Sequence, residues 1–195
     1  MTRRICVFCG SSPGVRESYR SAARALACEI AARQLGVVYG GGRSGLMGAL
    51  ADAALEAGAE VIGVIPRAMV EREVAHTGVT DLRMVRSMHE RKALMYELAD
   101  CFIALPGGFG TFEEFCEVLT WTQLGLQRKP CGILNVDDYY DHLLTFFDHA
   151  SGEGFVKPQH RLMVLSANTA PALLDRLIGY EAPRTDKWIE VLDET

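Results

Sequence analysis

The chain has 195 residues, of which 49% are hydrophobic and 23% are charged, and its formal net charge is −5. This composition is typical of a globular protein with a sizeable core. The acidic balance disfavours broad nucleic-acid binding, which needs a positive face, and no apolar run approaches the ~20 residues that a membrane span requires. The apolar run near the N-terminus is too short for a signal-peptide core, so we expect a cytoplasmic protein with neither membrane nor nucleic-acid partners.

Short apolar runs alternate with longer segments of helical spacing from residue 4 to residue 180. Strands are predicted over 4–9, 36–40, 59–66, 82–86, 101–105, 131–135 and 161–166, and helices over 15–35, 44–58, 88–99, 111–125, 139–152 and 170–180. The segment 67–81 is polar and irregular, and the tail 181–195 has no strong pattern. This alternation predicts βαβ units and a mainly parallel sheet flanked by helices. We therefore expect one doubly wound, Rossmann-like α/β domain over residues 1–195, with ligands bound beyond the carboxyl ends of its strands.

Six cysteines are spread along the chain, and two of them, Cys6 and Cys9, form a C-x-x-C motif inside the first predicted strand. Residues three apart on a strand point to opposite faces of the sheet. No second C-x-x-C completes a zinc site. We expect all six to be reduced thiols, most of them buried, as in a cytosolic protein.

The first glycine loop, Gly40–Gly45, matches G-x-G-x-x-G between a predicted strand and a predicted helix. A dinucleotide site also needs an acid at the end of the next strand. That strand ends in Arg67, and Glu60 lies at its other end. Three interpretations of the loop therefore remain. It could be a tight turn for close packing, or a nucleotide-binding loop that contacts a ligand through Gly41 and Gly42. The third, a full NAD site, is disfavoured by the missing acid.

The second glycine loop lies in "ALPGGFGTFEEF", between a predicted strand and a helix that begins near Thr111. A helix N-terminus offers free backbone N–H groups and a positive dipole end, which suit a phosphate. Gly107, Gly108 and Gly110 remove side chains that would block a ligand's approach, and Thr111 can add a hydroxyl. We expect this loop to hold a phosphate.

A carboxylate, Glu114, follows this loop directly. One explanation is structural, because Thr111 and Glu114 have the spacing of a helix capping box. The other is catalytic: a carboxylate beside a bound phosphate suits proton transfer to or from the attached sugar, which describes a nucleoside monophosphate. Such a site needs cations, and Arg91 and Lys92 near the start of the preceding helix can supply them. A solvated helix face is the ordinary explanation of such charges, but the need of this site for positive charge weakens it.

Taken in order, "YGGGRSGLMG", "MHERKALM" and "PGGFGTFEE" resemble the motifs of the Lonely Guy (LOG) family of cytokinin-activating phosphoribohydrolases. The resemblance covers residues 6–125 and, more loosely, 155–161. It implies hydrolysis of the N-glycosidic bond of adenine-type nucleoside 5′-monophosphates, such as cytokinin riboside monophosphates and AMP, to free base and ribose 5-phosphate. It also implies a homodimer, and we expect no metal or other cofactor. Relatives have been labelled lysine decarboxylases, but the lysines here form no pyridoxal-phosphate motif.

The resemblance implies that Arg91 and Glu114 are catalytic. The substrate contacts that it implies are Glu73, Arg91, Lys92, Gly108, Phe109, Gly110, Thr111, Phe112, Glu113, Glu114 and Thr120. Arginine does not deprotonate in proteins, so we assign Arg91 to holding Glu114 and stabilising negative charge. We expect Glu114 to activate water and to stabilise the positive charge that develops on the ribose. These motifs contain no evident proton donor for the leaving base.

Two other functions remain compatible with the sequence. The first is a nucleotide-binding or sensor protein without catalysis, in which Glu114 only caps its helix. The second is an oxidoreductase that uses the first glycine loop, which the missing acid disfavours.

Overall fold

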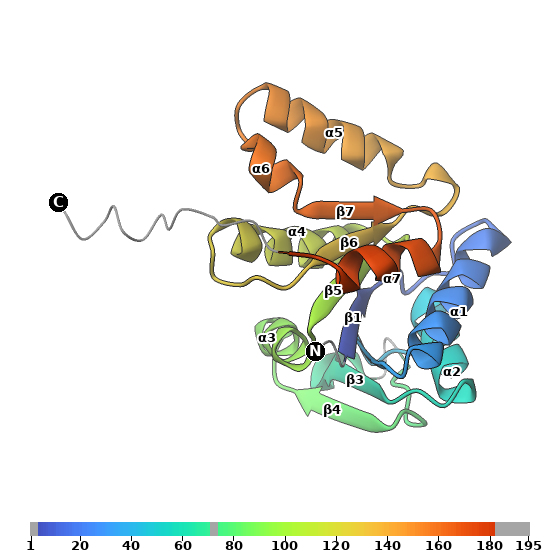
Figure 1. The fold of residues 1–195 in the computed structure, drawn as a ribbon. Helices are drawn as coiled ribbons and strands as arrows, with labels where there is room; N and C mark the ends of the chain where they lie inside the picture. Colours follow the sequence, from blue (N-terminus) through green and yellow to red (C-terminus); the bar gives the residue numbers. More distant parts are fainter. Residues whose placement is uncertain (1–3, 71–73, 182–195) are drawn as a thin grey trace.

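The computed structural model describes residues 4–70 and 74–181, which form one seven-stranded parallel sheet flanked by helices (Figure 1). The strands are β1 (Arg4–Phe8), β2 (Gly36–Tyr39), β3 (Val61–Pro66), β4 (Asp81–Val85), β5 (Cys101–Ala104), β6 (Cys131–Leu134) and β7 (Val164–Ala167). The helices are α1 (Glu17–Ala32), α2 (Gly45–Glu56), α3 (Met88–Leu98), α4 (Phe109–Gln123), α5 (Asp141–Gly152), α6 (Pro158–Arg161) and α7 (Ala170–Ile178), with 3-10 turns η1 (Arg67–Met69) and η2 (Val136–Asp138).

The strand order is β4-β3-β2-β1-β5-β6-β7, and every neighbouring pair is parallel. The chain therefore winds outward from β1 in one direction and from β5 in the other. The predicted doubly wound α/β fold is confirmed. Ligands in such sheets bind where the winding reverses, beyond the carboxyl ends of the strands. In this protein that place is the crevice between the ends of β1 and β5.

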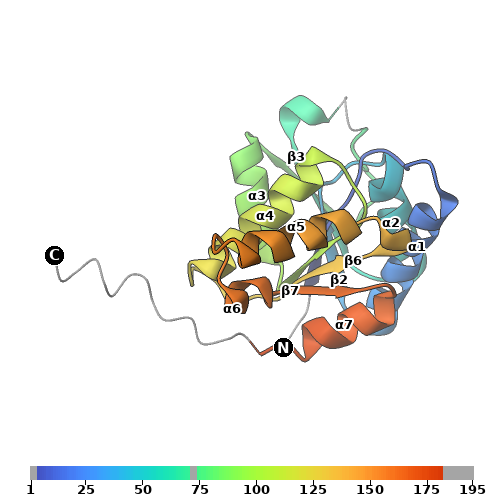
Figure 2. The same ribbon diagram turned by 90° about the horizontal axis from the view of Figure 1, so that it is seen from above.

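Helices cover both faces of the sheet. One hydrophobic cluster joins α1, α2 and α7 to one face, and the other joins α3, α4 and α5 to the opposite face. Figure 2 shows α3 and α4 on the side of the sheet away from α1 and α2. This coverage explains why the central strands are apolar along their whole length, as their burial pattern shows.

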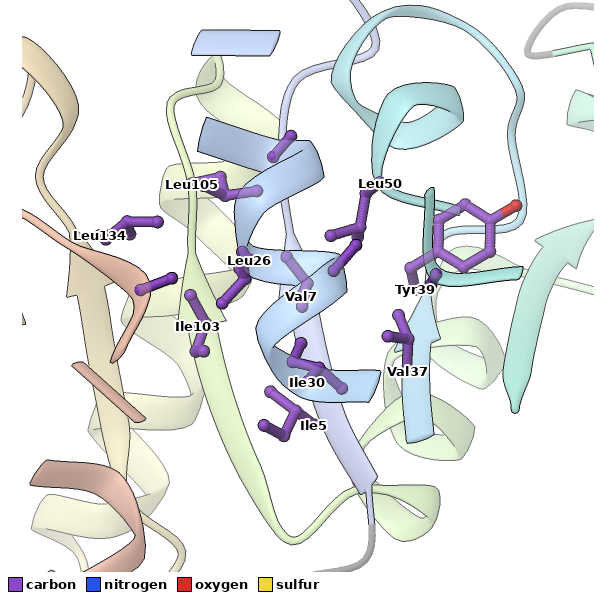
Figure 3. Packing of buried hydrophobic residues seen from close by; sticks show 14 of the residues in the cluster. Ile5, Val7, Leu26, Ile30, Val37, Tyr39, Leu50, Ile103, Leu105 and Leu134 are labelled. Atoms are coloured by element: carbon purple, nitrogen blue, oxygen red, sulfur yellow. The ribbon is translucent and has the colours of Figure 1, made fainter. Parts of the chain in front are cut away.

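The packing of α1 illustrates how the sequence forms the first layer. Leu26 and Ile30 lie one turn apart and point at Ile5, Val7 and Ile103 of the two central strands (Figure 3). All five side chains are buried. Burying a Leu or Ile stabilises the fold by about 1.5–3 kcal/mol, so this contact fixes α1 over the switch point of the sheet.

The start of α4 differs from the prediction. The helix begins at Phe109 with Gly108 as its N-cap, two residues before the expected start, and no described side chain caps it. Gly108 has extended backbone angles, φ −101° and ψ −157°, so the turn into the helix is complete before Thr111. The capping-box explanation of Thr111 and Glu114 is therefore wrong, because both residues lie inside the helix.

Two further element boundaries differ from the predicted ones, each for a local reason. Helix α5 begins at Asp141 rather than at residue 139, because Tyr139 ends the 3-10 turn η2 and Tyr140, the N-cap of α5, has non-helical backbone angles of φ −99° and ψ 5°. Strand β7 begins three residues late because the short helix α6 occupies 158–161. The prediction for the tail falls, apart from residue 181, outside the described residues.

The cysteine predictions are confirmed in part, because only Cys6, Cys101 and Cys131 are buried, which is half of the six rather than most of them. Cys6 packs in the cluster beneath α3 and α4, whereas Cys9 packs against the cluster beneath α1 and α2, so the C-x-x-C pair does point to opposite faces. All six cysteines fall within the described residues, and all are free thiols.

Candidate active site

A pocket of about 320 Å³ opens at the carboxyl ends of β1, β2 and β5. Gly10 and Ser11 line it after β1, Gly40 lines it after β2, and the start of α4 closes another side. Arg91 of α3 and Glu114 of α4 both face this space. The structure thus brings together the two residues to which the sequence assigned the chemistry.

Arg91 is held by the backbone of the neighbouring strands. Its side chain is only 5% exposed, and its guanidinium donates to the Val64 carbonyl from Nε at 3.1 Å and to the Gly40 carbonyl from Nη2 at 2.7 Å. A Cβ at Gly40 would lie 2.0 Å from Nη2. Gly40 is therefore required for the guanidinium to approach the loop after β2 so closely.

The second glycine loop has an open side. A Cβ added at Gly108 or at Gly110 would meet no atom of the described chain within 4 Å, whereas one at Gly107 would meet Thr111 Oγ1 at 2.1 Å. Packing within the described chain thus explains Gly107 but does not explain Gly108 or Gly110. The N–H groups of a helix's first turn have no partner inside the helix, so this surface suits an anion that approaches the backbone directly.

Two tyrosines that the sequence did not single out hold this loop in place. Tyr139 donates its hydroxyl to the Gly107 carbonyl at 2.5 Å, and Tyr140 donates to the Leu105 carbonyl at 2.7 Å. Burial raises the pKa of the Tyr140 hydroxyl, which keeps it protonated as a donor. The available signal was their position in the connection that follows β6, at the sheet edge where the glycine loops also lie.

The charges of Arg91 and Glu114 act on the same neighbour, Cys9. Burial and then the Glu114 carboxylate raise the pKa of the Cys9 thiol, while the Arg91 guanidinium lowers it. Cys9 therefore remains a neutral thiol and a poor proton donor at physiological pH. It lines the pocket together with these two groups of opposite charge.

Lys92 does not join Arg91 in the pocket. Its ammonium group contacts the carboxylates of Glu113 at 2.5 Å and Glu117 at 2.9 Å. Burial lowers the pKa of Lys92, but hydrogen bonds to these carboxylates outweigh it, and the pKa is raised. Lys92 thus ties α3 to α4, and Arg91 is the member of the predicted cation pair that lines the pocket.

The remaining predicted residues divide between the pocket and other places. Phe109, Thr111 and Glu113 line the pocket with Gly108 and Gly110. The lining does not include Gly41 or Gly42, nor Phe112, whose ring packs edge-on against Phe109 and Tyr140. Thr120 lies further along α4 and borders a different hollow beside α5 and α6. Glu73 lies outside the described residues.

Part of the pocket wall was not predicted. It includes four methionines: Met47, Met69, Met88 and Met95. Methionine is flexible and polarisable, so these side chains give the pocket an adaptable apolar lining. The sequence gives no sign that these methionines share a pocket, because they come from α2, η1 and α3 and meet only in the fold.

Within the described residues, no group of His, Cys, Asp and Glu could hold a metal ion, and no helix could cross a membrane.

Comparison with known proteins gives the family. A family model described as "Possible lysine decarboxylase" matches residues 47–177. The chain is 53% identical over 178 residues to "Probable cytokinin riboside 5'-monophosphate phosphoribohydrolase LOGL9" of Oryza sativa subsp. japonica, covering 91% of this chain and 78% of that protein. It is 51% identical over 179 residues to "Cytokinin riboside 5'-monophosphate phosphoribohydrolase LOG5" of Arabidopsis thaliana, covering 92% and 78%.

The chain belongs to the LOG family. Solved structures with this LOG fold are more distant in sequence. The molybdenum cofactor carrier protein of Chlamydomonas reinhardtii has a TM-score of 0.69 at 19% identity, covering 92% of this chain and 100% of that one. The molybdenum cofactor binding protein of Rippkaea orientalis has a TM-score of 0.67 at 20% identity, covering 91% and 96%. These two similarities support the Rossmann-like fold.

The pocket of this LOG protein does not fit the decarboxylase description. Enzymes that use pyridoxal phosphate hold it through a lysine Schiff base. Of the lysines that the structure describes, none lines the pocket. Lys92 is held by α4, and Lys129 donates to the Tyr96 carbonyl at 2.7 Å.

Proposed function

We propose that this protein hydrolyses the N-glycosidic bond of adenine-type nucleoside 5′-monophosphates, cytokinin riboside monophosphates and AMP among them, to free base and ribose 5-phosphate. The observation that carries the proposal is the presence of both Arg91 and Glu114 in the lining of one pocket with an open helix N-terminus. The curated relatives at about 50% identity are named as enzymes of this activity, which disfavours a purely nucleotide-binding or sensor role.

Each part of the pocket has a role in this reaction. The backbone N–H groups at Gly108–Thr111 bind the 5′-phosphate, because a helix N-terminus favours an anion. The phosphate then fixes the ribose with its C1′ atom toward Glu114. This orientation removes part of the entropic barrier to the reaction.

Glu114 takes a proton from water, which attacks C1′ as the bond to the base breaks. The carboxylate also stabilises the positive charge that develops on the ribose ring. Overall the water hydroxyl goes to C1′ and one proton goes to the departing base. Arg91, which stays protonated, holds Glu114 and balances the negative charge of substrate and carboxylate. The methionine wall contacts the base.

The direct test is to incubate the purified protein with AMP and with isopentenyladenosine monophosphate. Free base and ribose 5-phosphate are the expected products, and an equal preparation of the Glu114→Gln variant controls for contaminating hydrolases. Binding of both nucleotides without release of base would favour the sensor role and overturn the proposal.

We also propose that the reaction needs no metal ion. Activity that EDTA abolishes and magnesium restores would contradict this part.

We further propose that the protein acts in the cytoplasm as a homodimer. Phe146 of α5 is 61% exposed and Phe155 is 85% exposed, and the described part of α5 contains no buried side chain. Exposed aromatic side chains of this kind on a weakly buried helix and the segment after it are typical of an interface. Thr120 borders this region and lies away from the Arg91–Glu114 pocket of its own chain, so a substrate contact from Thr120 requires a second copy.

Light scattering after gel filtration tests this assembly. The expected mass is twice that of the chain, and Phe146→Glu is expected to reduce it to one chain. A monomeric wild-type protein with full activity would contradict the homodimer. The six free thiols support a reducing compartment.

A further inference from the structure

His76 is a buried histidine outside the proposed active site. It is 3% exposed, and its Nε2 atom lies 2.8 Å from Oδ1 of Asp52 on α2. Its Nδ1 atom accepts a hydrogen bond from the Gly78 N–H at 3.2 Å. Because Nδ1 is an acceptor, the ring proton is on Nε2 and is donated to Asp52. Both ring nitrogens are thus engaged, and the imidazole has one orientation.

The backbone around His76 is bonded to the first glycine loop. His76 N–H donates to the Gly41 carbonyl at 2.9 Å, and Arg43 N–H donates to the Val74 carbonyl at 2.9 Å. Gly42 and Ala75 form an antiparallel bridge between these two bonds. Segment 74–76 therefore lies along the loop like a short strand, and the His76 side chain anchors that segment to α2.

Asp52 strengthens the same anchor from the other side. Its Oδ1 atom also lies 3.7 Å from the guanidinium of Arg43, which follows the three glycines. One carboxylate of α2 thus contacts both the segment that supports the loop and the loop itself. Displacing His76 would leave this carboxylate with the weaker of its two partners.

The loop in turn holds Arg91. The Gly40 carbonyl accepts from Arg91 Nη2, and the next carbonyl along the chain, that of Gly41, accepts from His76. Asp52 is therefore connected to the guanidinium of Arg91 in three steps. It is hydrogen-bonded to the side chain of His76, the His76 N–H is hydrogen-bonded to Gly41, and the adjacent residue Gly40 is hydrogen-bonded to Arg91. The Gly40 contact is one of two backbone carbonyls that orient Arg91.

We propose that His76, held by Asp52, is a positioning residue for the hydrolysis: it fixes the first glycine loop and through it the guanidinium of Arg91. This inference rests on the proposed function. It predicts an effect on kcat more than on substrate binding. The phosphate is bound by α4, which these hydrogen bonds do not touch, whereas Arg91 acts on the charges of the reacting centre.

The test compares variants of the full-length protein with AMP as substrate. We expect His76→Ala to lower kcat by about 10-fold or more and to change KM by less than about threefold. Glutamine places an amide N–H near the position of Nε2, so His76→Gln is expected to recover kcat to within about threefold of wild type. Gln127→Ala is the matched control, because Gln127 is also buried and bonded, to Thr122 and Val118. This control is expected to cost stability and to leave kcat unchanged.

A double-mutant cycle tests whether His76 acts through Arg91. In the Arg91→Lys background, His76→Ala is expected to lower kcat by less than about twofold further. Two independent and multiplying losses would overturn the inference, as would wild-type kcat in His76→Ala. If His76→Ala and Gln127→Ala both lowered kcat in proportion to their loss of stability, His76 would have only a structural role. A wild-type protein that releases no base from either nucleotide would refute the proposed function, and this inference with it.

Discussion

The two glycine loops of this protein have similar sequences and opposite surroundings. In the first, a Cβ at Gly40 would come within 2.0 Å of Arg91, and one at Gly45 would come within 2.4 Å of the Ser11 backbone. In the second, a Cβ at Gly108 or Gly110 would meet no described atom within 4 Å. Both loops join a strand to a helix at the same sheet edge. Their glycines nevertheless serve different purposes, since Gly40 and Gly45 make room for protein atoms, as Gly107 does, whereas Gly108 and Gly110 leave room for a ligand.

The two loops therefore have different roles: the first supports Arg91, and the second forms part of the site where the reaction takes place. The first loop packs inward and presents a carbonyl to Arg91. The second presents the start of α4 to the pocket and is followed by Glu114. Substitutions in the first loop should therefore affect the position of Arg91, whereas substitutions in the second loop should affect substrate binding and the reaction itself.

The largest effect is expected for Glu114→Gln. The substitution removes the base that activates water but leaves the α4 backbone intact, so we expect kcat to fall by about 1,000-fold, equivalent to about 4 kcal/mol. Ribose 5-phosphate should bind with the affinity that it has for wild type, as measured by calorimetry. A variant with near wild-type turnover would show that the second loop holds a ligand beside a carboxylate with no part in the chemistry.

Removing the 5′-phosphate from the substrate should have the next largest effect. The open side of the second loop suits an anion, and binding energy from that phosphate would orient the ribose against Glu114. We expect kcat/KM for adenosine or isopentenyladenosine to be at least about 100-fold lower than for the monophosphate, or about 2.7 kcal/mol. Equal values for nucleoside and nucleotide would refute a phosphate site at Gly108–Thr111.

The first loop is tested by Gly40→Ala. The added methyl group meets the far end of a flexible side chain, so we expect the protein to fold while the guanidinium of Arg91 moves. The expected result is a loss of about 30-fold in kcat with a small change in thermal midpoint. Gly152→Ala is the control, because a Cβ at Gly152, at the end of α5, meets no described atom within 4 Å. If Gly40→Ala keeps full kcat, the loop does not position Arg91.

The sequence predicted the second loop better than the first. For the second loop, three glycines before Thr111 and Glu114 pointed to a ligand, and the pocket contains both residues. Its helix start was misplaced, because the T-x-x-E spacing fits a capping box as well as an interior turn. Only the extended backbone of Gly108 distinguishes the two.

For the first loop, G-x-G-x-x-G left packing and nucleotide contact open. The choice depends on residues far away in sequence, such as Arg91 and His76, and on what their side chains reach. The alternation of strands and helices predicted the fold because burial of both sheet faces is a local property of each strand. Tyr139, by contrast, escaped prediction because its bond to Gly107 joins segments 32 residues apart.

The smallest expected effect is that of Gly110→Ala in the second loop. Gly110 lies in the first turn of α4, and a Cβ there meets no described atom of the chain. Alanine favours a helix over glycine by about 1 kcal/mol, so the free energy of unfolding should stay the same or rise by up to that amount, as measured by urea denaturation. The methyl group would occupy the space where the phosphate approaches the backbone. We therefore expect KM for AMP to rise by about 10-fold, equivalent to about 1.4 kcal/mol, with kcat within about threefold of wild type. The comparison with Gly40→Ala is decisive, because that substitution should lower kcat and leave KM nearly unchanged. If Gly110→Ala changed neither KM nor stability, the open side of the second loop would be ordinary surface, and the contrast between the two loops would not extend to function.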